Sequence, residues 1–270
     1  MKGLIPFLFI IFLSLVLNAQ EIKVTKIEKL ELEHPAYFPK FGNSAEVLLF
    51  SGEQYKGLSI YYLATQKELQ ITREAGAGVK ASMQADGSVL YRTTTFNLGR
   101  KQTEEKKFIN GKVISHKSKI ANEIRVSTDG KIIKVLGGDF DEKILNPLGE
   151  VYYLWASLSP DKTKIVFTAA GRGTYVIDIN GKLISNLGYL NAPKWLTNHW
   201  IIGMNDTDDG HQIISSNVVA THVPSGKRID LTETNASLIA LYPEASPDGN
   251  RIVFQSQKGE IYLLDVSIHD

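Results

Sequence analysis

The chain has 270 residues, of which 43% are hydrophobic and 22% charged, with a formal net charge of +1. This composition is typical of a globular protein with an ordinary core, and it excludes a disordered or collagen-like chain. The absence of cysteine excludes disulfides, thiol catalysis and cysteine-bound zinc.

The N-terminus carries the pattern of a secretory signal peptide. Lys2 is followed by an apolar run from Leu4 to Leu17, and the small residue Ala19 marks the expected cleavage site. We therefore predict a signal peptide over residues 1–19 and a single domain over residues 20–270. Removing residues 1–19 leaves 29 basic and 29 acidic residues. A neutral exported chain argues against nucleic acid as a partner and against membrane insertion after cleavage.

Three segments repeat the same strand, turn and strand pattern. Ser159-Pro-Asp161 and Ser246-Pro-Asp248 each lead into Ile-Val-Phe, and a looser copy is centred on Asp86. Proline presets a turn angle, and aspartate accepts hydrogen bonds from nearby backbone amides. We therefore expect Asp86, Asp161 and Asp248 to be structural residues of hairpin turns. A second hairpin follows each copy, as at Asn180-Gly181, so the repeat unit has four strands.

The spacing of the first turn in each unit indicates an all-β propeller of four-stranded blades. These turns fall near Asn43, Asp86, Asp161, Thr197 and Asp248, in steps of 43, 75, 36 and 51 residues. The step of 75 has two explanations. Either a polar insertion covers residues 97–119, or a further blade is built around Ser127-Thr-Asp-Gly130. The count is five blades, with six as the alternative.

The two ends of the domain are expected to close the ring. The last unit lacks its outer strand, and residues 22–30 largely alternate apolar and polar side chains, as a half-buried strand does. An N-terminal strand that completed the last blade would leave no strand without a partner. The alternative for this stretch is an independent helix.

The Ser-Pro-Asp-Gly turn, followed by Ile-Val-Phe and later by Ile261-Tyr-Leu-Leu-Asp265, resembles the Pro-Asp repeat of TolB-like propellers and of the propeller in dipeptidyl peptidase IV-like proteins. The resemblance is closest at residues 159–178 and 246–265. It implies a WD-like propeller that presents a face and a channel to protein partners. The peptidases carry their chemistry in a separate hydrolase domain, and this sequence has no Gly-x-Ser-x-Gly nucleophile motif.

The densest polar cluster is the predicted ligand-binding face. Asp206, Asp208 and Asp209 could supply oxygens to calcium, although they match the order of a calcium loop only in part. The alternative is a polar turn with local hydrogen bonds. The loop around Arg172 is expected on the same face, beside these acids and His211. No other cofactor is expected, and no catalytic residue is assigned.

Two functions follow from these observations. The first is a monomeric, non-catalytic binding or scaffold module with a protein partner in the cell envelope of a Gram-negative bacterium, either periplasmic or secreted. The alternative is a small hydrolase or lyase that acts on a glycan or peptide with acidic residues in the propeller channel. Convergence of two or more acidic or histidine side chains in a deep channel pocket distinguishes the second from the first.

Overall fold

The computed structural model describes residues 21–97, 100–116, 124–138, 140–233 and 238–269, so the predicted signal peptide lies outside the described residues. Apart from one short 3-10 turn, η1 (Glu53–Tyr55), the described regular elements are all strands. None of the helical structure in these ranges is long and apolar enough to cross a membrane. Alternation of apolar and polar residues, with turns rich in glycine and aspartate, accounts for this all-β fold.

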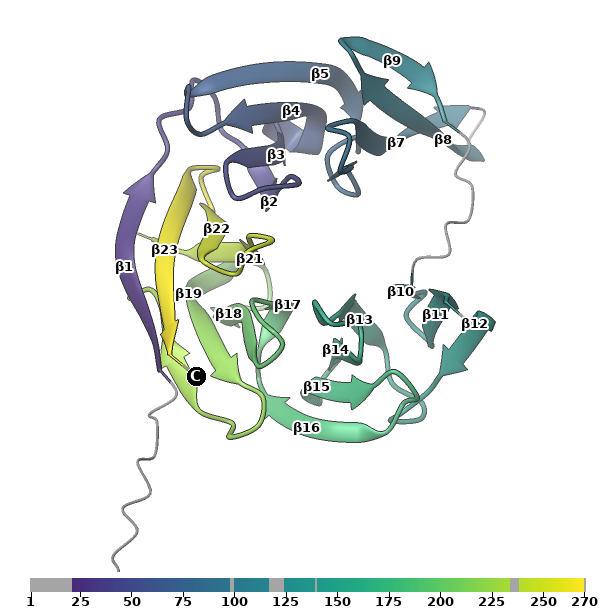
Figure 1. Cartoon of the computed structure of the whole chain (residues 1–270), viewed down its shortest axis with the longest axis vertical. Coiled ribbons are helices and arrows are strands. Elements are labelled where there is room, and N and C mark those ends of the chain that lie inside the picture. The colour runs from purple at the N-terminus through teal and green to yellow at the C-terminus, as the bar shows by residue number, and fades with distance from the viewer. Residues whose placement is uncertain (1–20, 98–99, 117–123, 139, 234–237, 270) are drawn as a thin grey trace, which may run out of the picture.

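The strands form six antiparallel sheets that follow one another around a ring (Figure 1). We number these blades 1 to 6 in chain order. Blade 1 consists of β2 (Tyr37–Phe41), β3 (Val47–Ser51), β4 (Lys56–Tyr62) and β5 (Lys67–Ala75). Blade 2 consists of β6 (Ser82–Met83), β7 (Val89–Asn97), β8 (Arg100–Ile109) and β9 (Lys112–Ser115).

Blade 3 has three strands, namely β10 (Arg125–Thr128), β11 (Ile133–Gly137) and β12 (Phe140–Leu145). Blade 4 consists of β13 (Tyr153–Leu158), β14 (Lys164–Ala169), β15 (Gly173–Asp178) and β16 (Leu183–Gly188). Blade 5 consists of β17 (Asn191–Trp195), β18 (Trp200–Asp208), β19 (Ile213–His222) and β20 (Arg228–Asp230).

Blade 6 combines both ends of the described chain. Its inner strands are β21 (Ala240–Ala245), β22 (Arg251–Ser256) and β23 (Ile261–His269), and β1 (Glu21–Lys29) is its outer strand. β1 runs antiparallel to β23, with Glu21 opposite His269 and Lys29 opposite Tyr262. The closing strand is therefore where the alternation in residues 22–30 placed it, and a helix there is excluded.

The count of five blades is wrong and its alternative is confirmed, because the described residues form six blades and one of them is built around Ser127-Thr-Asp-Gly130. The long step between Asp86 and Asp161 contains both the second hairpin of blade 2 and the whole of blade 3. Residues 97–119, for which an insertion was one of the two explanations, contain strands β8 and β9. The charged side chains of β8 pair across strands and blades, as in the Lys106–Glu74 ion pair at 2.6 Å, and so replace the apolar alternation that marks an ordinary strand.

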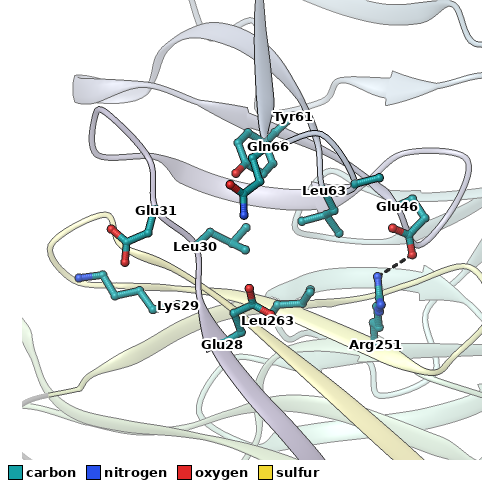
Figure 2. A pocket seen from close by; sticks show the side chains of 11 residues that line it. Glu28, Lys29, Leu30, Glu31, Glu46, Tyr61, Leu63, Gln66, Arg251 and Leu263 are labelled. Carbon is teal, nitrogen blue, oxygen red and sulfur yellow. Dashed lines mark hydrogen bonds and ion pairs between the residues drawn. The ribbon is translucent and has the colours of Figure 1, made fainter.

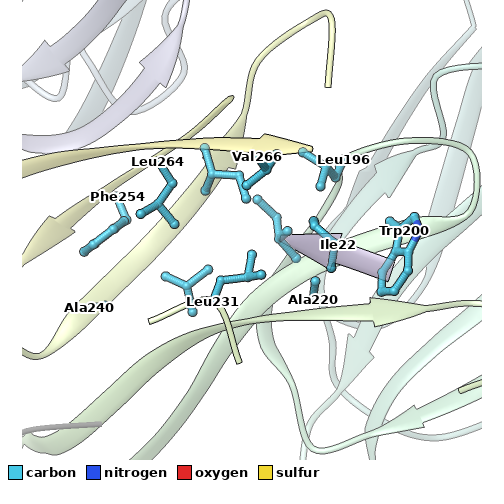
Figure 3. Packing of buried hydrophobic residues seen from close by; sticks show 12 residues of the cluster. Ile22, Leu196, Trp200, Ala220, Leu231, Ala240, Phe254, Leu264 and Val266 are labelled. Carbon is cyan, nitrogen blue, oxygen red and sulfur yellow. The ribbon is translucent and has the colours of Figure 1, made fainter. Parts of the chain in front are cut away.

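Hydrophobic clusters hold neighbouring blades together. The largest lies between blades 5 and 6, where Ile22 of β1 packs among Trp200, Leu264 and Val266 (Figure 3). Because Ile22 is only 2% exposed, the closing strand contributes to this core through its side chain as well as its backbone.

The joint between blades 6 and 1 adds ion pairs to its apolar cluster. Arg251 of β22 donates to Glu46 at 2.7 Å across the joint, and also to Asp265 at 3.0 Å within its own blade (Figure 2). A depression of about 200 Å³ lies beside this bridge. Since both Arg251 and Lys29, which pairs with Glu260, already have partners, we interpret this depression as part of ring closure.

Aspartates of the repeated turns accept local hydrogen bonds. Asp248 Oδ1 accepts from Ser246 Oγ at 2.5 Å and from the Asn250 amide at 3.2 Å, and the Ser246 hydroxyl lowers the pKa of this carboxyl. Asp161 has the same arrangement with Ser159 and Thr163. At Asp86, hydrogen bonds from the Ser88 hydroxyl and amide lower the pKa to about 2.

Asp248→Ala should lower the free energy of unfolding by about 1 kcal/mol, because the Ser246 hydroxyl and the Asn250 amide lose their acceptor. Thermal or urea unfolding measures the change. Glu68→Ala, which removes an exposed carboxylate of β5, is the comparison. A D248A protein that unfolds like the wild type would contradict the structural role of this carboxylate.

Candidate functional site

The innermost strands of four blades carry the same bulge. In β2, β13, β17 and β21 the register with the second strand shifts by one residue near the start of the strand. The residue at each bulge has a positive φ, which is a strained conformation for any residue except glycine. These residues are Phe38 at 53°, Trp155 at 50°, Ala192 at 46° and Tyr242 at 53°.

Neighbouring blades hold two of these bulges in place. The Phe38 amide donates to Gln255 Oε1, a buried side chain of β22, at 2.5 Å. The Tyr242 amide donates to Met204 Sδ of β18 at 3.0 Å. Each of these two bulged strands is thus fixed by the second strand of the preceding blade. Backbone strain that the surrounding structure maintains in this way is a recurrent feature of functional sites.

The four bulge residues line a single pocket of about 200 Å³, which we call the central pocket because its walls come from the innermost strands of four blades. The rings of Phe38 and Tyr242 lie with their centroids 5.1 Å apart on one wall, and Trp155 is 37% exposed on another. Aromatic faces with one wet side bind the apolar faces of sugars and other flat ligands.

Three charged side chains share this pocket with the aromatic rings. The Lys194 ammonium pairs with Glu244 at 2.5 Å, and both side chains are half-buried. Lys40 Nζ donates to the Val79 carbonyl at 3.0 Å. Burial lowers the pKa of Lys40; Glu244 opposes this effect and the positive charge of Lys194 adds to it. Lys40 is therefore easier to deprotonate than an ordinary lysine, which is the property required of a general base.

The pKa of Tyr242 is shifted in the opposite direction from that of Lys40. Burial raises the pKa of its hydroxyl, and the charges of Tyr55 and Asp206 act in the same direction. Tyr242 consequently keeps its proton across the neutral range. The central pocket combines a lysine that readily loses its proton with a tyrosine that holds one.

Asp206 is not among the residues that line this pocket, but its charge acts on Tyr242, which is one of them. It is a buried residue of strand β18 rather than of the turn that follows. Its carboxylate accepts from Asn191 Nδ2 at 3.0 Å and is hydrogen-bonded to Tyr189. Burial raises the pKa of Asp206, and these two partners oppose that effect.

Asp208, Asp209 and His211 lie together at the turn between β18 and β19, and Arg172 lies in the turn between β14 and β15. Arg172 is exposed and donates to the Leu148 carbonyl at 3.4 Å. Asp208 accepts from the Gly210 amide at 2.8 Å. Asp209 accepts from the amides of His211 and Gln212, which lower the pKa of its carboxyl.

The local hydrogen bonds of Asp208 and Asp209 match the alternative of a polar turn. Within the described ranges, the side chains form no group of three or more metal-ligating residues. Calcium at Asp206, Asp208 and Asp209 therefore stays a prediction.

The charged residues of the central pocket, Lys40, Lys194 and Glu244, were missed by the sequence analysis, although they leave a signal. Three of the four bulges have the form Phe38-Pro-Lys40, Ala192-Pro-Lys194 and Tyr242-Pro-Glu244. Each tripeptide follows the outer strand of the preceding blade, so the repeat coincides with the start of an inner strand. The fourth bulge, Trp155-Ala-Ser157, lacks both the proline and the charge.

Fold and site together define a six-bladed β-propeller with a strained, aromatic and charged pocket at the centre of the ring. A search of family models and of curated proteins found no match. Among solved structures, the chain is similar to oligogalacturonate lyase from Vibrio parahaemolyticus, with a TM-score of 0.52 and 10% identity over 91% of this chain and 98% of that one. It is also similar to a gluconolactonase from Xanthomonas campestris, with a TM-score of 0.54 and 9% identity over 91% of both chains.

These comparisons confirm the propeller fold, and likeness at this level of identity establishes the fold alone. The solved propellers to which the chain is similar are named as enzymes, which contradicts the prediction of a non-catalytic scaffold but does not by itself assign an activity to this chain. Of the two functions drawn from the sequence, the glycan-acting alternative agrees better with the names of these neighbours.

Proposed function

We propose that this protein is an exported propeller enzyme that cleaves an acidic glycan in the central pocket by β-elimination. The observation that carries the proposal is Lys40, a half-buried lysine with a lowered pKa beside the Lys194–Glu244 pair and the aromatic rings. Export is supported by the signal-peptide pattern of residues 1–19, and a relationship to TolB-like propellers is supported by the Ser-Pro-Asp repeats.

The proposed reaction assigns a role to each group, and Tyr242 has two. Phe38 and Tyr242 stack against the sugar ring, while the Lys194 ammonium binds the carboxylate of a uronate unit and stabilises the charge that develops on it. Neutral Lys40 Nζ removes the proton from the carbon next to this carboxylate. The electron pair of that bond forms the new carbon–carbon double bond, the bond to the glycosidic oxygen breaks, and the Tyr242 hydroxyl protonates the leaving oxygen.

Elimination fits the pocket better than hydrolysis by a pair of carboxyl groups. Hydrolysis of a glycosidic bond ordinarily needs two carboxyl groups on opposite sides of that bond. Among the described residues that line the pocket, Glu244 is the one carboxylate, so the second carboxyl group that hydrolysis needs is missing. One base, one acid and one cation are present, which is the set that elimination from a uronate requires.

The products of the reaction test the proposal. Incubation of residues 20–270 with oligogalacturonate should give an unsaturated product, detected by its ultraviolet absorbance. Mass spectrometry should show that the fragment masses add up to the mass of the substrate. Fragments that together contain one extra water molecule would mean hydrolysis, and no cleavage of acidic glycans of several linkages would overturn the proposal.

The two charges beside Lys40 should shift the pH dependence of the reaction in opposite directions. Glu244 raises the pKa of Lys40, so E244Q should move the acidic limb of the kcat/KM profile to lower pH. Lys194 lowers this pKa, so K194M should move the limb to higher pH, besides weakening the binding of substrate. Shifts of the same sign in both variants would show that the limb reports another group.

A further inference from the structure

The joint between blades 2 and 3 differs from the other joints of the ring. Each of the other five has a hydrophobic cluster with members from both blades, such as Leu58 with Val89 between blades 1 and 2 and Ile133 with Phe167 between blades 3 and 4. In the part of the chain that the structure describes, no such cluster joins blades 2 and 3. Apolar packing therefore does not explain why these two faces lie opposite each other.

A pocket of about 450 Å³ takes the place of a core at this joint. We call it the joint pocket; the residues that carry the argument are Lys80, Ser82, Arg92, Glu105, His116 and Arg125. Ser82 lies in β6, with Lys80 just before it, and Arg92 and Glu105 lie in β7 and β8. His116 follows β9, and Arg125 lies in β10 across the joint. Four strands at the usual spacing span roughly 14 Å, so the joint pocket is long enough for several sugar units rather than one.

The charges of the joint pocket are mainly positive. Arg92 Nε donates to Glu105 Oε1 at 2.8 Å, and Lys106, which also lines the pocket, pairs with Glu74 at 2.6 Å. Of the positive charges in the described lining, Lys80 and Arg125 are left uncompensated. Neither Lys80 nor Arg125 has an ion pair with any residue in the described ranges, and both are exposed. Like charges on facing walls repel each other, and a bound anion would remove that repulsion.

Two consecutive residues of the chain line the two pockets. Val79 lines the central pocket and its carbonyl accepts from Lys40 Nζ, while the next residue, Lys80, lines the joint pocket. The two pockets are therefore neighbours, and an oligomer with one unit in the central pocket would have further units near Lys80.

We propose that the joint pocket is a subsite for an anionic oligosaccharide, whose carboxylates bind Lys80 and Arg125 while one unit occupies the central pocket. This inference rests on the proposed function for the class of ligand, and it adds that the substrate is an oligomer. Guanidinium and ammonium groups bind carboxylates through charge-assisted hydrogen bonds, and arginine can form two at once.

Calorimetric titration with galacturonate oligomers of increasing length tests the subsite, using the catalytically weakened K40M protein to prevent cleavage. Affinity should rise with length and fall as salt is added. In the K40M background, K80A/R125A should weaken binding of the longer oligomers by about tenfold or more, and leave the dimer unchanged. K67A/K182A removes two exposed lysines elsewhere and should bind like the parent protein.

The outcomes separate the subsite from the proposed reaction. If the wild type cleaves oligomers but K80A/R125A leaves the length dependence unchanged, the subsite is overturned and the reaction stands. If oligomers bind with the expected dependence on Lys80 and Arg125 but are not cleaved by the wild type, the subsite stands and the reaction fails. Equal affinity for uncharged oligomers of the same length would overturn the subsite, because its recognition depends on charge.

Discussion

Replacement of Lys40 by methionine should lower kcat for cleavage of an acidic glycan by a factor of about 10² to 10⁴, the usual contribution of a positioned general base. Methionine keeps most of the length and the apolar stem of lysine but cannot accept a proton. Because Lys40 is the pocket lysine with a lowered pKa, its loss should affect turnover more than binding. Initial rates across a range of substrate concentrations separate kcat from KM.

Two controls distinguish a base from a residue that only maintains the pocket. K67M removes an exposed lysine of β5 and should leave kcat unchanged. Because the chain contains no cysteine, a K40C protein can be aminoethylated at that position alone, which restores a primary amine at nearly the original distance. Recovery of activity after this treatment would support the base. A K40M protein with the kcat of the wild type would exclude it.

Much of the fold could be predicted from local sequence, because each hairpin turn carries its own chemistry. Asp161 and Asp248 mark equivalent turns through the same hydrogen bonds to a serine two residues earlier. The number of blades could not be counted from these turns alone. In β8 ion pairs replace the apolar alternation that marks a strand, and blade 3 has three strands.

The central pocket could be predicted only in part. Its tripeptides were visible in the sequence, but the strained bulge that turns Phe38 and Tyr242 toward each other depends on hydrogen bonds from neighbouring blades. These two residues are 204 positions apart, and the closed ring brings their rings into contact. Asp206 was identified from its acidic surroundings, whereas its link to Tyr242 is a consequence of how blades 5 and 6 pack.

Closure of the ring should depend far more on the Ile22 side chain of β1 than on the Ile27 side chain of the same strand. Ile22 is 2% exposed and packs against the core between blades 5 and 6, whereas Ile27 is 52% exposed (Figure 3). I22D would bury a charge without a partner and should lower the free energy of unfolding by at least about 3 kcal/mol. I27D introduces the same charge into the same strand, and its effect should stay within about 0.5 kcal/mol.

Urea unfolding of the two variants, followed by tryptophan fluorescence, measures this difference because Trp200 lies in the cluster that Ile22 completes.

Removal of residues 21–29 should have a larger effect than I22D, since β23 would also lose the backbone partner that it has from Glu21 to Lys29. The unpaired edge of β23 would then be free to pair with another molecule, and light scattering should detect aggregation. A truncated protein that remains monomeric and unfolds at the same urea concentration as the wild type would show that blade 6 is stable without β1.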